Sequence, residues 1–302
     1  MTDTVPPELP ALPARRVRLA TAADAPSADT LKQVLTARLL ELKPELAKPL
    51  AAIPAPVPGL GAPTDSVFDF GFSLDVQKMV DFANAQAAAV AATPYKCADL
   101  ADLNTGFAEL RTSMANPGLM MAAPALKGAR AVVTRFEMPA GGEPIVEGTL
   151  LIASDNPQSL VALAGNFAPQ VTALGLKPGA PPMPLPAELA PPGTPPMYAA
   201  MTDKALAFAV GANQESTLPG VLGAAPGTPP PLLTFGYGGK FFEAIADAGM
   251  MGLADKSDEE RAEAERGLKL MKDLYGRMLA HLDVSVLLTE RGVEMRQTMK
   301  MK

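Results

Sequence analysis

Methionine is the residue type in this chain that allows the largest number of chemical roles. Sixteen methionines occur among 302 residues, and several are adjacent in sequence. Thioether sulfur binds soft Cu(I), and the flexible side chain also forms an adaptable apolar lining. Because most of these methionines lie in apolar stripes, we expect core packing for the majority and no metal site. We predict a surface for a ligand or a partner at Met120, Met121, Met250, Met251 and Tyr237.

Residue types that serve as nucleophiles or general bases are scarce. His281 is the single histidine, and no GxSxG motif supplies a nucleophile for it. We predict a structural role for it at a helix-to-strand junction, where a helix C-terminus favours a cation. Cys97 is the single cysteine and is predicted to begin a helix, a position that can activate a thiol. Without a second cysteine we expect an incidental or buried thiol, so we predict no catalytic residue and no cofactor.

A glycine-rich segment, Gly236-Tyr237-Gly238-Gly239-Lys240, follows a predicted strand and opens a predicted helix. Helix N-termini in that position often bind phosphate. The spacing matches neither GxxxxGK(S/T) nor GxGxxG, and the equivalent residues 71–75 lack the extra glycines and the lysine. We therefore predict a structural strand-to-helix corner.

These segments belong to a pattern that occurs twice. Residues 66–154 and 232–302 each read as a strand, two helices and a β-hairpin, and the strands end in Phe70-Gly71-Phe72 and Phe235-Gly236-Tyr237. The apolar stripe of the second helix recurs at a constant offset of 168 residues, from Leu100, Leu103, Phe107 and Leu110 to Leu268, Met271, Tyr275 and Met278. The pattern predicts an α+β fold with internal duplication, in which antiparallel hairpins are covered on one face by helices. The predicted units are residues 1–155 and 156–302.

Local signals predict the remaining elements. Ser257 and Glu260 form a capping-box pattern ahead of a helix over 257–279, and the alternation of apolar residues predicts hairpins over 282–301 and 131–153. A further hairpin is predicted over 197–210, with a short helix over 215–222. Upstream in the first unit, we predict a strand over 17–20 and a helix over 29–42. Residues 178–196 contain too many prolines for a central strand or helix, and we predict a surface arm or an extended crossover.

Composition limits the classes of function. The net charge is −6 and the sequence pI is about 5.0, which argues against nucleic acid as a partner because phosphate binding needs a concentrated basic face. No apolar run reaches the roughly 18 to 20 residues of a transmembrane helix. The low charge, 32 prolines and absence of tryptophan favour a periplasmic or secreted bacterial envelope protein, with the cytoplasm as the alternative. The hairpin at 198–210 loosely resembles uncharacterised bacterial envelope proteins with repeated hairpins.

From these observations we expect a non-enzymatic envelope protein that binds a partner protein or an apolar ligand between its two units. One alternative is a structural or assembly component, whose proline-rich arms dock on another chain. The other is a hydrolase-type enzyme that uses carboxylates, serine or lysine.

Overall fold

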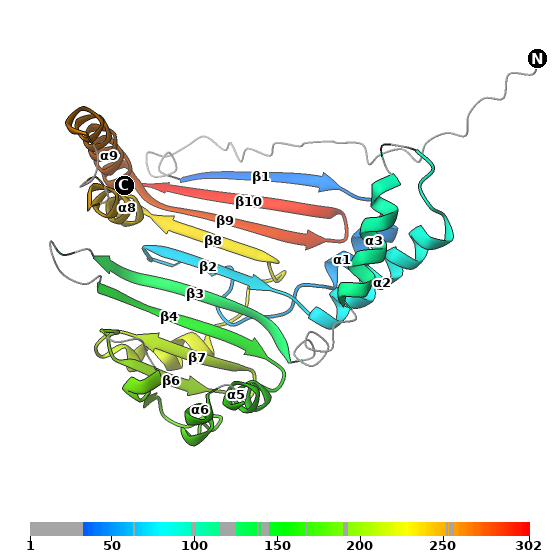
Figure 1. The fold of residues 1–302 in the computed structure, drawn as a ribbon, viewed down its shortest axis with the longest axis horizontal. Helices are drawn as coiled ribbons and strands as arrows, with labels where there is room; N and C mark the ends of the chain where they lie inside the picture. Colours follow the sequence, from blue (N-terminus) through cyan, green and yellow to red (C-terminus); the bar gives the residue numbers. More distant parts are fainter. Residues whose placement is uncertain are drawn as a thin grey trace, which may run out of the picture.

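One antiparallel sheet organises the computed structural model of this chain (Figure 1). The structure describes residues 33–62, 64–97, 99, 101–114, 125–137, 139, 145–166, 168–189, 193–251, 253 and 257–302. The strand order is β1-β10-β9-β8-β2-β3-β4-β7-β6-β5, and every neighbouring pair among them is antiparallel. The prediction of an α+β fold is confirmed, and the two predicted units share this sheet.

The strands are β1 (Gln33–Glu41), β2 (Phe68–Ser73), β3 (Leu126–Glu137), β4 (Ile145–Ser154), β5 (Met183–Pro184), β6 (Met197–Met201), β7 (Ala205–Val210), β8 (Leu233–Gly238), β9 (Leu279–Thr289) and β10 (Gly292–Met301). The α-helices are α1 (Pro44–Ala51), α2 (Val76–Ala92), α3 (Ala101–Met114), α5 (Pro157–Gly165), α6 (Pro169–Ala173), α7 (Leu218–Gly223), α8 (Gly239–Met251) and α9 (Asp258–Met278). Short 3-10 helices cover Ala187–Leu189 and Gln214–Thr217.

The order of elements from β2 to β4 is the same as the order from β8 to β10. The two series run outward from the central β2–β8 pair, as β2-β3-β4 on one side and β8-β9-β10 on the other. One more strand extends each series. β7 pairs with β4 and, in the chain, comes before the series β8-β9-β10. β1 pairs with β10 and comes before the series β2-β3-β4. The two halves of the chain are therefore interlocked through the sheet.

Most predicted elements are confirmed. Ser257 caps α9, its hydroxyl accepts from the N–H of Glu260, and the reciprocal contact completes the capping box. The hairpins β3–β4, β6–β7 and β9–β10 lie where alternation predicts them, and Asn156 caps α5 by accepting from the N–H of Ser159. The described residues of 178–196 contribute the two-residue edge strand β5 and a 3-10 turn, as their prolines predict.

The helix predicted over 29–42 is wrong, because residues 33–41 form β1. The spacing of Leu35, Leu39 and Leu42 suits a helix, but the nine residues of β1 pair in continuous register with β10. That partner lies more than 250 residues away in sequence, so the hydrogen bonds that decide the conformation leave no local signal. The strand predicted over 17–20 lies outside the described residues.

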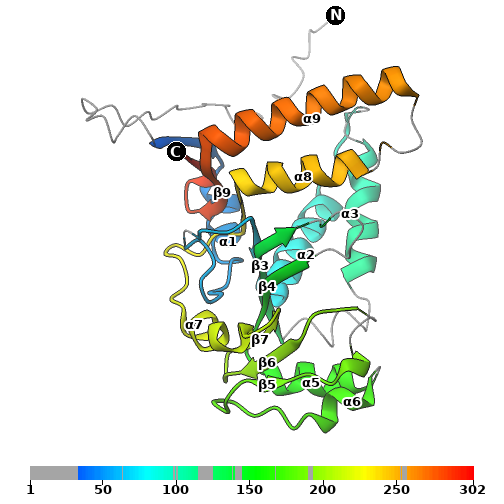
Figure 2. The ribbon, with the colours of Figure 1, turned by 90° about the vertical axis from the view of Figure 1, so that its left-hand side faces the viewer.

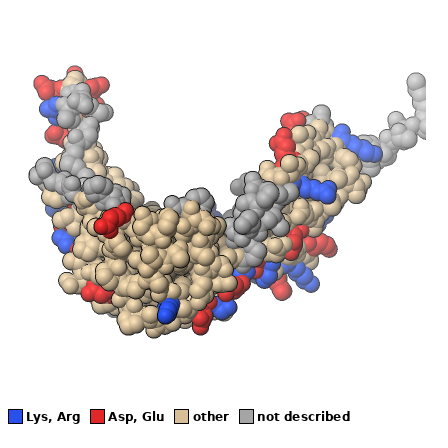
Figure 3. Space-filling view, turned by 60° about the horizontal axis from the view of Figure 1, so that its bottom comes forward, with Lys and Arg blue, Asp and Glu red and all other residues tan. Residues whose placement is uncertain are grey.

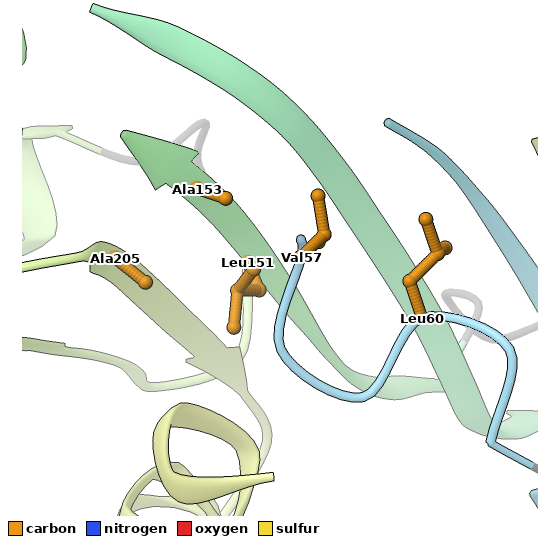
Figure 4. Close-up of a cluster of buried hydrophobic side chains, with 5 residues drawn as sticks. All are labelled: Val57, Leu60, Leu151, Ala153 and Ala205. Atoms are coloured by element: carbon orange, nitrogen blue, oxygen red, sulfur yellow. The ribbon is translucent and has the colours of Figure 1, made fainter. Parts of the chain in front are cut away.

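The prediction that helices cover one face is also wrong in part. From one face, which we call the inner face, the hairpins α2–α3 and α8–α9 and the pair α5–α6 project in the same direction (Figure 2). The opposite, outer face is covered by α7 and by the loop at residues 53–62. There Val57 and Leu60 of the loop pack with Leu151, Ala153 and Ala205 of the sheet (Figure 4). Both faces of the β4–β7 region are apolar, so each needs its own cover.

A buried ion pair fastens that loop to the sheet. Arg130 of β3 donates through Nε and Nη2 to the Asp69 carboxylate of β2, at 3.3 and 2.5 Å, and both residues are buried. The same guanidinium donates to the carbonyl oxygens of Gly59 and Ala62 in the loop. Gly71 allows the close approach, since a Cβ there would lie 2.4 Å from Leu60. The ion pair therefore adds polar contacts between loop and sheet beside the apolar cluster that contains Val57 and Leu60.

Candidate functional site

The inner face of the sheet is apolar across seven strands. In the central row, successive strands from β9 to β6 place uncharged side chains side by side: Val284, Phe235, Phe70, Ala131, Leu150, Phe208 and Ala199. The rows on either side are equally free of charge: Leu282, Tyr237, Phe68, Val133, Gly148, Val210 and Met197, then Val286, Leu233, Phe72, Ala129, Ile152, Leu206 and Met201. At about 4.8 Å between strands, the apolar rows extend roughly 29 Å.

The middle of this face is open. Phe70 and Leu150 are 40% and 41% exposed although their strands lie inside the sheet. The helical hairpins α8–α9 and α2–α3 rise at opposite ends of the sheet and leave a hollow between them (Figure 3). Large apolar side chains inside a sheet are ordinarily buried, and an open apolar patch marks a place where another molecule binds.

A groove of about 850 Å³ lies at one side of this face, between the β3–β4 and β6–β7 hairpins and the helices α5 and α6. Among the described residues, its lining contains no charged side chain, and Thr149 is the one polar residue, at a position of β4 whose side chain lies on the outer face. The lining residues are Leu126, Ala131, Val132, Val133, Val146, Gly148, Thr149, Leu150, Ile152, Leu160, Val161, Leu163, Ala164, Ala168, Val171, Leu174, Leu176, Leu185, Leu189, Met197, Leu206, Phe208 and Val210. They come from both predicted units, residues 1–155 and 156–302.

Local sequence signals position the wall formed by α5 and α6. Asn156 caps α5 and Pro157 begins it, while Ser154 Oγ accepts from the N–H of Asn156 at 3.0 Å and fixes the turn out of β4. Pro169 begins α6 in the same way, and proline is well placed at the first helical turn. Because α5 is apolar on the side that carries Leu160 and Leu163, it turns an apolar wall toward the sheet.

Charged side chains anchor the strand ends next to this groove. Lys127 follows the lining residue Leu126, and its Nζ lies 2.9 Å from Asp75 Oδ2 and 3.0 Å from Asp155 Oδ2. Burial raises the pKa of Asp75, but hydrogen bonds from Lys127 and from the N–H of Lys78 outweigh it and hold that pKa below its ordinary value. The hydrogen bond from Lys127 also lowers the pKa of Asp155. Burial lowers the pKa of Lys127, and the two carboxylates more than reverse this.

We expect Lys127→Met to destabilise the protein by about 1–3 kcal/mol at pH 7, because both carboxylates lose a charged hydrogen bond. The folded-state pKa values of Asp75 and Asp155 lie below the unfolded ones. The ion pairs therefore stabilise the fold above about pH 4 and lose that contribution as the pH falls further. Urea unfolding of both proteins from pH 7 to pH 3 checks this. A stability difference that stays constant down to pH 3 would contradict it.

The predicted surface residues do not meet in this groove. Tyr237 lies in an aromatic cluster under α8, with its ring centroid 5.4 Å from those of Phe241 and Phe242. Met250 is exposed near the far end of α8, roughly 16 Å along the helix from its start, and Met251 belongs to the same turn. Met120 and Met121 lie outside the described residues. The structure places the groove elsewhere, in residues that the sequence shows only as alternating apolar strands and a short apolar helix.

The other chemically notable residues lie outside the groove. His281 is the third residue of β9, next to the predicted junction between α9 and that strand, and it is buried. Cys97 is exposed and precedes α3. Gly239 begins α8 directly after β8, and a Cβ there would lie 2.6 Å from the carbonyl oxygen of Leu279, so this glycine permits close packing against the end of α9. Met295, Met299 and Met301 pack against the cluster of Leu279, Leu282 and Val284.

Within the described residues, no helix is long and apolar enough to span a membrane. The described side chains also contain no group of three or more histidine, cysteine, aspartate or glutamate residues that could hold a metal ion. Comparison with known protein families, curated proteins and solved structures found no match to this chain.

Proposed function

We propose that this protein binds an apolar small molecule, or the acyl chain of an amphiphile, in the groove beneath α5 and α6, and releases it chemically unchanged. The observation that carries the proposal is the groove lining, in which the described residues are all apolar apart from Thr149, whose side chain lies on the outer face of β4. Such a lining stabilises hydrocarbon and offers nothing to a charged or strongly polar ligand.

The size of the groove supports this assignment. Small-molecule sites commonly enclose about 300–1,000 Å³, and this groove encloses about 850 Å³. Each buried methylene group contributes about 0.8 kcal/mol, so a chain of ten would gain roughly 8 kcal/mol before the entropic cost of association. The open row that contains Phe70 continues the apolar floor beyond the groove, toward the aromatic cluster at Tyr237.

The non-catalytic part of the proposal rests on residue types. Acid–base and nucleophilic catalysis use histidine, cysteine, carboxylate, lysine or an activated hydroxyl. Among the described residues that line the groove, Thr149 is the one with such a group, and its side chain lies on the outer face of β4.

We also infer an internal duplication and a place in the bacterial envelope. The duplication is supported by the matching element order and by the symmetric strand order about the β2–β8 pair. The envelope location rests on composition, namely 32 prolines, one cysteine and no tryptophan.

Native mass spectrometry of the gently purified protein tests ligand binding. We expect an adduct that survives desalting, disappears after organic extraction, and is recovered in the extract as a lipid-like molecule. Rebinding of the neutral dye Nile red by the extracted protein should be saturable at one site. A clean apo mass together with no saturable Nile red binding would show that the groove does not serve this purpose.

A further inference from the structure

A second candidate site lies on the outer face, on the opposite side of the sheet from the groove. It is a pocket of about 300 Å³ over β2, β8, β9 and β10. The register places three polar side chains of β10 beside three of β9: Arg296 beside Ser285, Thr298 beside Asp283, and Lys300 beside His281. On the next strand, Thr234, Gly236 and Gly238 of β8 follow in the same three rows.

Two buried side chains lack hydrogen-bond partners here: Thr234, which lines the pocket, and His281, which lies beside the lining residue Asp283. Thr234 is 8% exposed and lines the pocket, and its Oγ1 has no partner among the described residues. His281 is 6% exposed, and neither ring nitrogen has a hydrogen-bond partner there, although Nε2 lies 3.2 Å from Asp283 Oδ1. A buried polar group without a partner destabilises a fold, so such groups point to a molecule that completes them.

Gly236 lets two side chains of β9 lie close against β8. A Cβ at this position would lie 2.9 Å from His281 Nε2 and 3.0 Å from Asp283 Oδ1. The imidazole and the carboxylate therefore occupy the place that a side chain at residue 236 would take. The hydroxyl of Thr234 lies one row along β8 and lines the same pocket as Asp283.

The acidic and basic side chains around the pocket are equal in number once the ion pairs among them are set aside. Asp69 pairs with Arg130, and Arg296 donates to Glu294 Oε1 at 2.7 Å. The two other charged side chains of the lining are Asp283 and Lys300, one anion and one cation on neighbouring strands. An anionic ligand would meet Asp283, and a cationic ligand would meet Lys300. A neutral ligand whose groups both donate and accept satisfies the Thr234 hydroxyl, the Lys300 ammonium and the Asp283 carboxylate together.

We propose that this outer-face pocket binds a small, neutral, polyhydroxylated molecule the size of a single sugar ring. Ligand hydroxyls donate to Asp283 and accept from Thr234 and Lys300, all three of which line the pocket. The volume of about 300 Å³ is at the lower end for ligand sites and suits one ring. The site shares no lining residue with the apolar groove and does not depend on it.

Titration of the intact protein followed by NMR tests this site, with glucose and myo-inositol as neutral probes and phosphate and glycine as charged ones. We expect saturable shift changes at Thr234, Asp283 and His281 with a neutral probe only. Thr234→Val should weaken that binding at least tenfold. It should also raise the melting temperature of the unliganded protein, because the partnerless hydroxyl is gone. Thr105→Val, on the exposed surface of α3, is the matched control and should change neither property.

Three results would overturn the proposal. One is the absence of saturable change with either polyol up to about 10 mM, tenfold above a Kd of 1 mM, which would leave ordered water as the only occupant. Another is a preference for phosphate or glycine. The third is unchanged polyol binding in Thr234→Val. A failure of Nile red to bind would leave this site untouched, since the two pockets lie on opposite faces.

Discussion

Replacement of Asp69 by Asn is expected to lower the free energy of unfolding by about 3–5 kcal/mol. The substitution leaves the Arg130 guanidinium buried without a counter-charge, beneath a loop that excludes water. Breaking one partner of a buried pair is costly because the remaining charge is desolvated and uncompensated. Urea unfolding followed by circular dichroism measures the effect.

Two comparisons make this measurement specific. Glu137→Gln removes a carboxylate from the exposed pair with Arg135, and it should cost far less than Asp69→Asn because solvent screens that pair. The double variant Asp69→Leu, Arg130→Met replaces both charges with apolar groups and should recover much of the lost stability. A cost below about 1 kcal/mol for Asp69→Asn would mean that the pair is already hydrated and does not fasten the loop.

Leu150→Glu is expected to weaken Nile red binding at least 100-fold, which corresponds to about 2.7 kcal/mol. Leu150 lies in the central inner row, between Ala131 and Phe208, and all three line the groove. A carboxylate there either stays hydrated and excludes the dye or loses its water at high cost. Because Leu150 is partly exposed in the unliganded protein, the stability of the fold should change much less than binding does.

Matched variants separate loss of the site from loss of the fold. Leu270→Glu makes the same change on α9, at a position that is 67% exposed, and it should bind Nile red as the wild type does. Leu150→Met keeps the position apolar and should also retain binding. If Leu150→Glu binds the dye with unchanged affinity while remaining folded, the dye occupies a different surface.

Much of the fold is predictable from sequence because its signals are local. The alternating residues of the β9–β10 hairpin predict a strand pair, and the Ser257–Glu260 capping box predicts where α9 begins. Both features operate within a few residues, so a single sequence contains them. β1 is different, because its conformation depends on hydrogen bonds to β10.

The candidate site was less predictable for a related reason. Phe70 and Leu150 have the pattern of inward-facing core residues, and the sequence correctly indicates an apolar face. Whether another element covers that face depends on where α5, α6 and the two helical hairpins project, which is a matter of tertiary geometry. The sequence predicts a surface at the methionine clusters because so many methionines are unusual. The groove is instead built from common apolar residues at ordinary spacing, which give no distinct signal.

The pairing of β1 with β10 has a consequence for how the chain is made. Glu41 pairs with Gly292, a residue synthesised 251 positions later, so this ladder cannot close until almost all of the described chain has left the ribosome. Contacts over such separations form slowly. During translation β1 stays unpaired until β10 has been synthesised. A chain that ends before β10 therefore exposes both β1 and the edge of β9. Unpaired strand edges recruit other chains, so truncated products of this gene should aggregate even where the β2–β4 region has already folded.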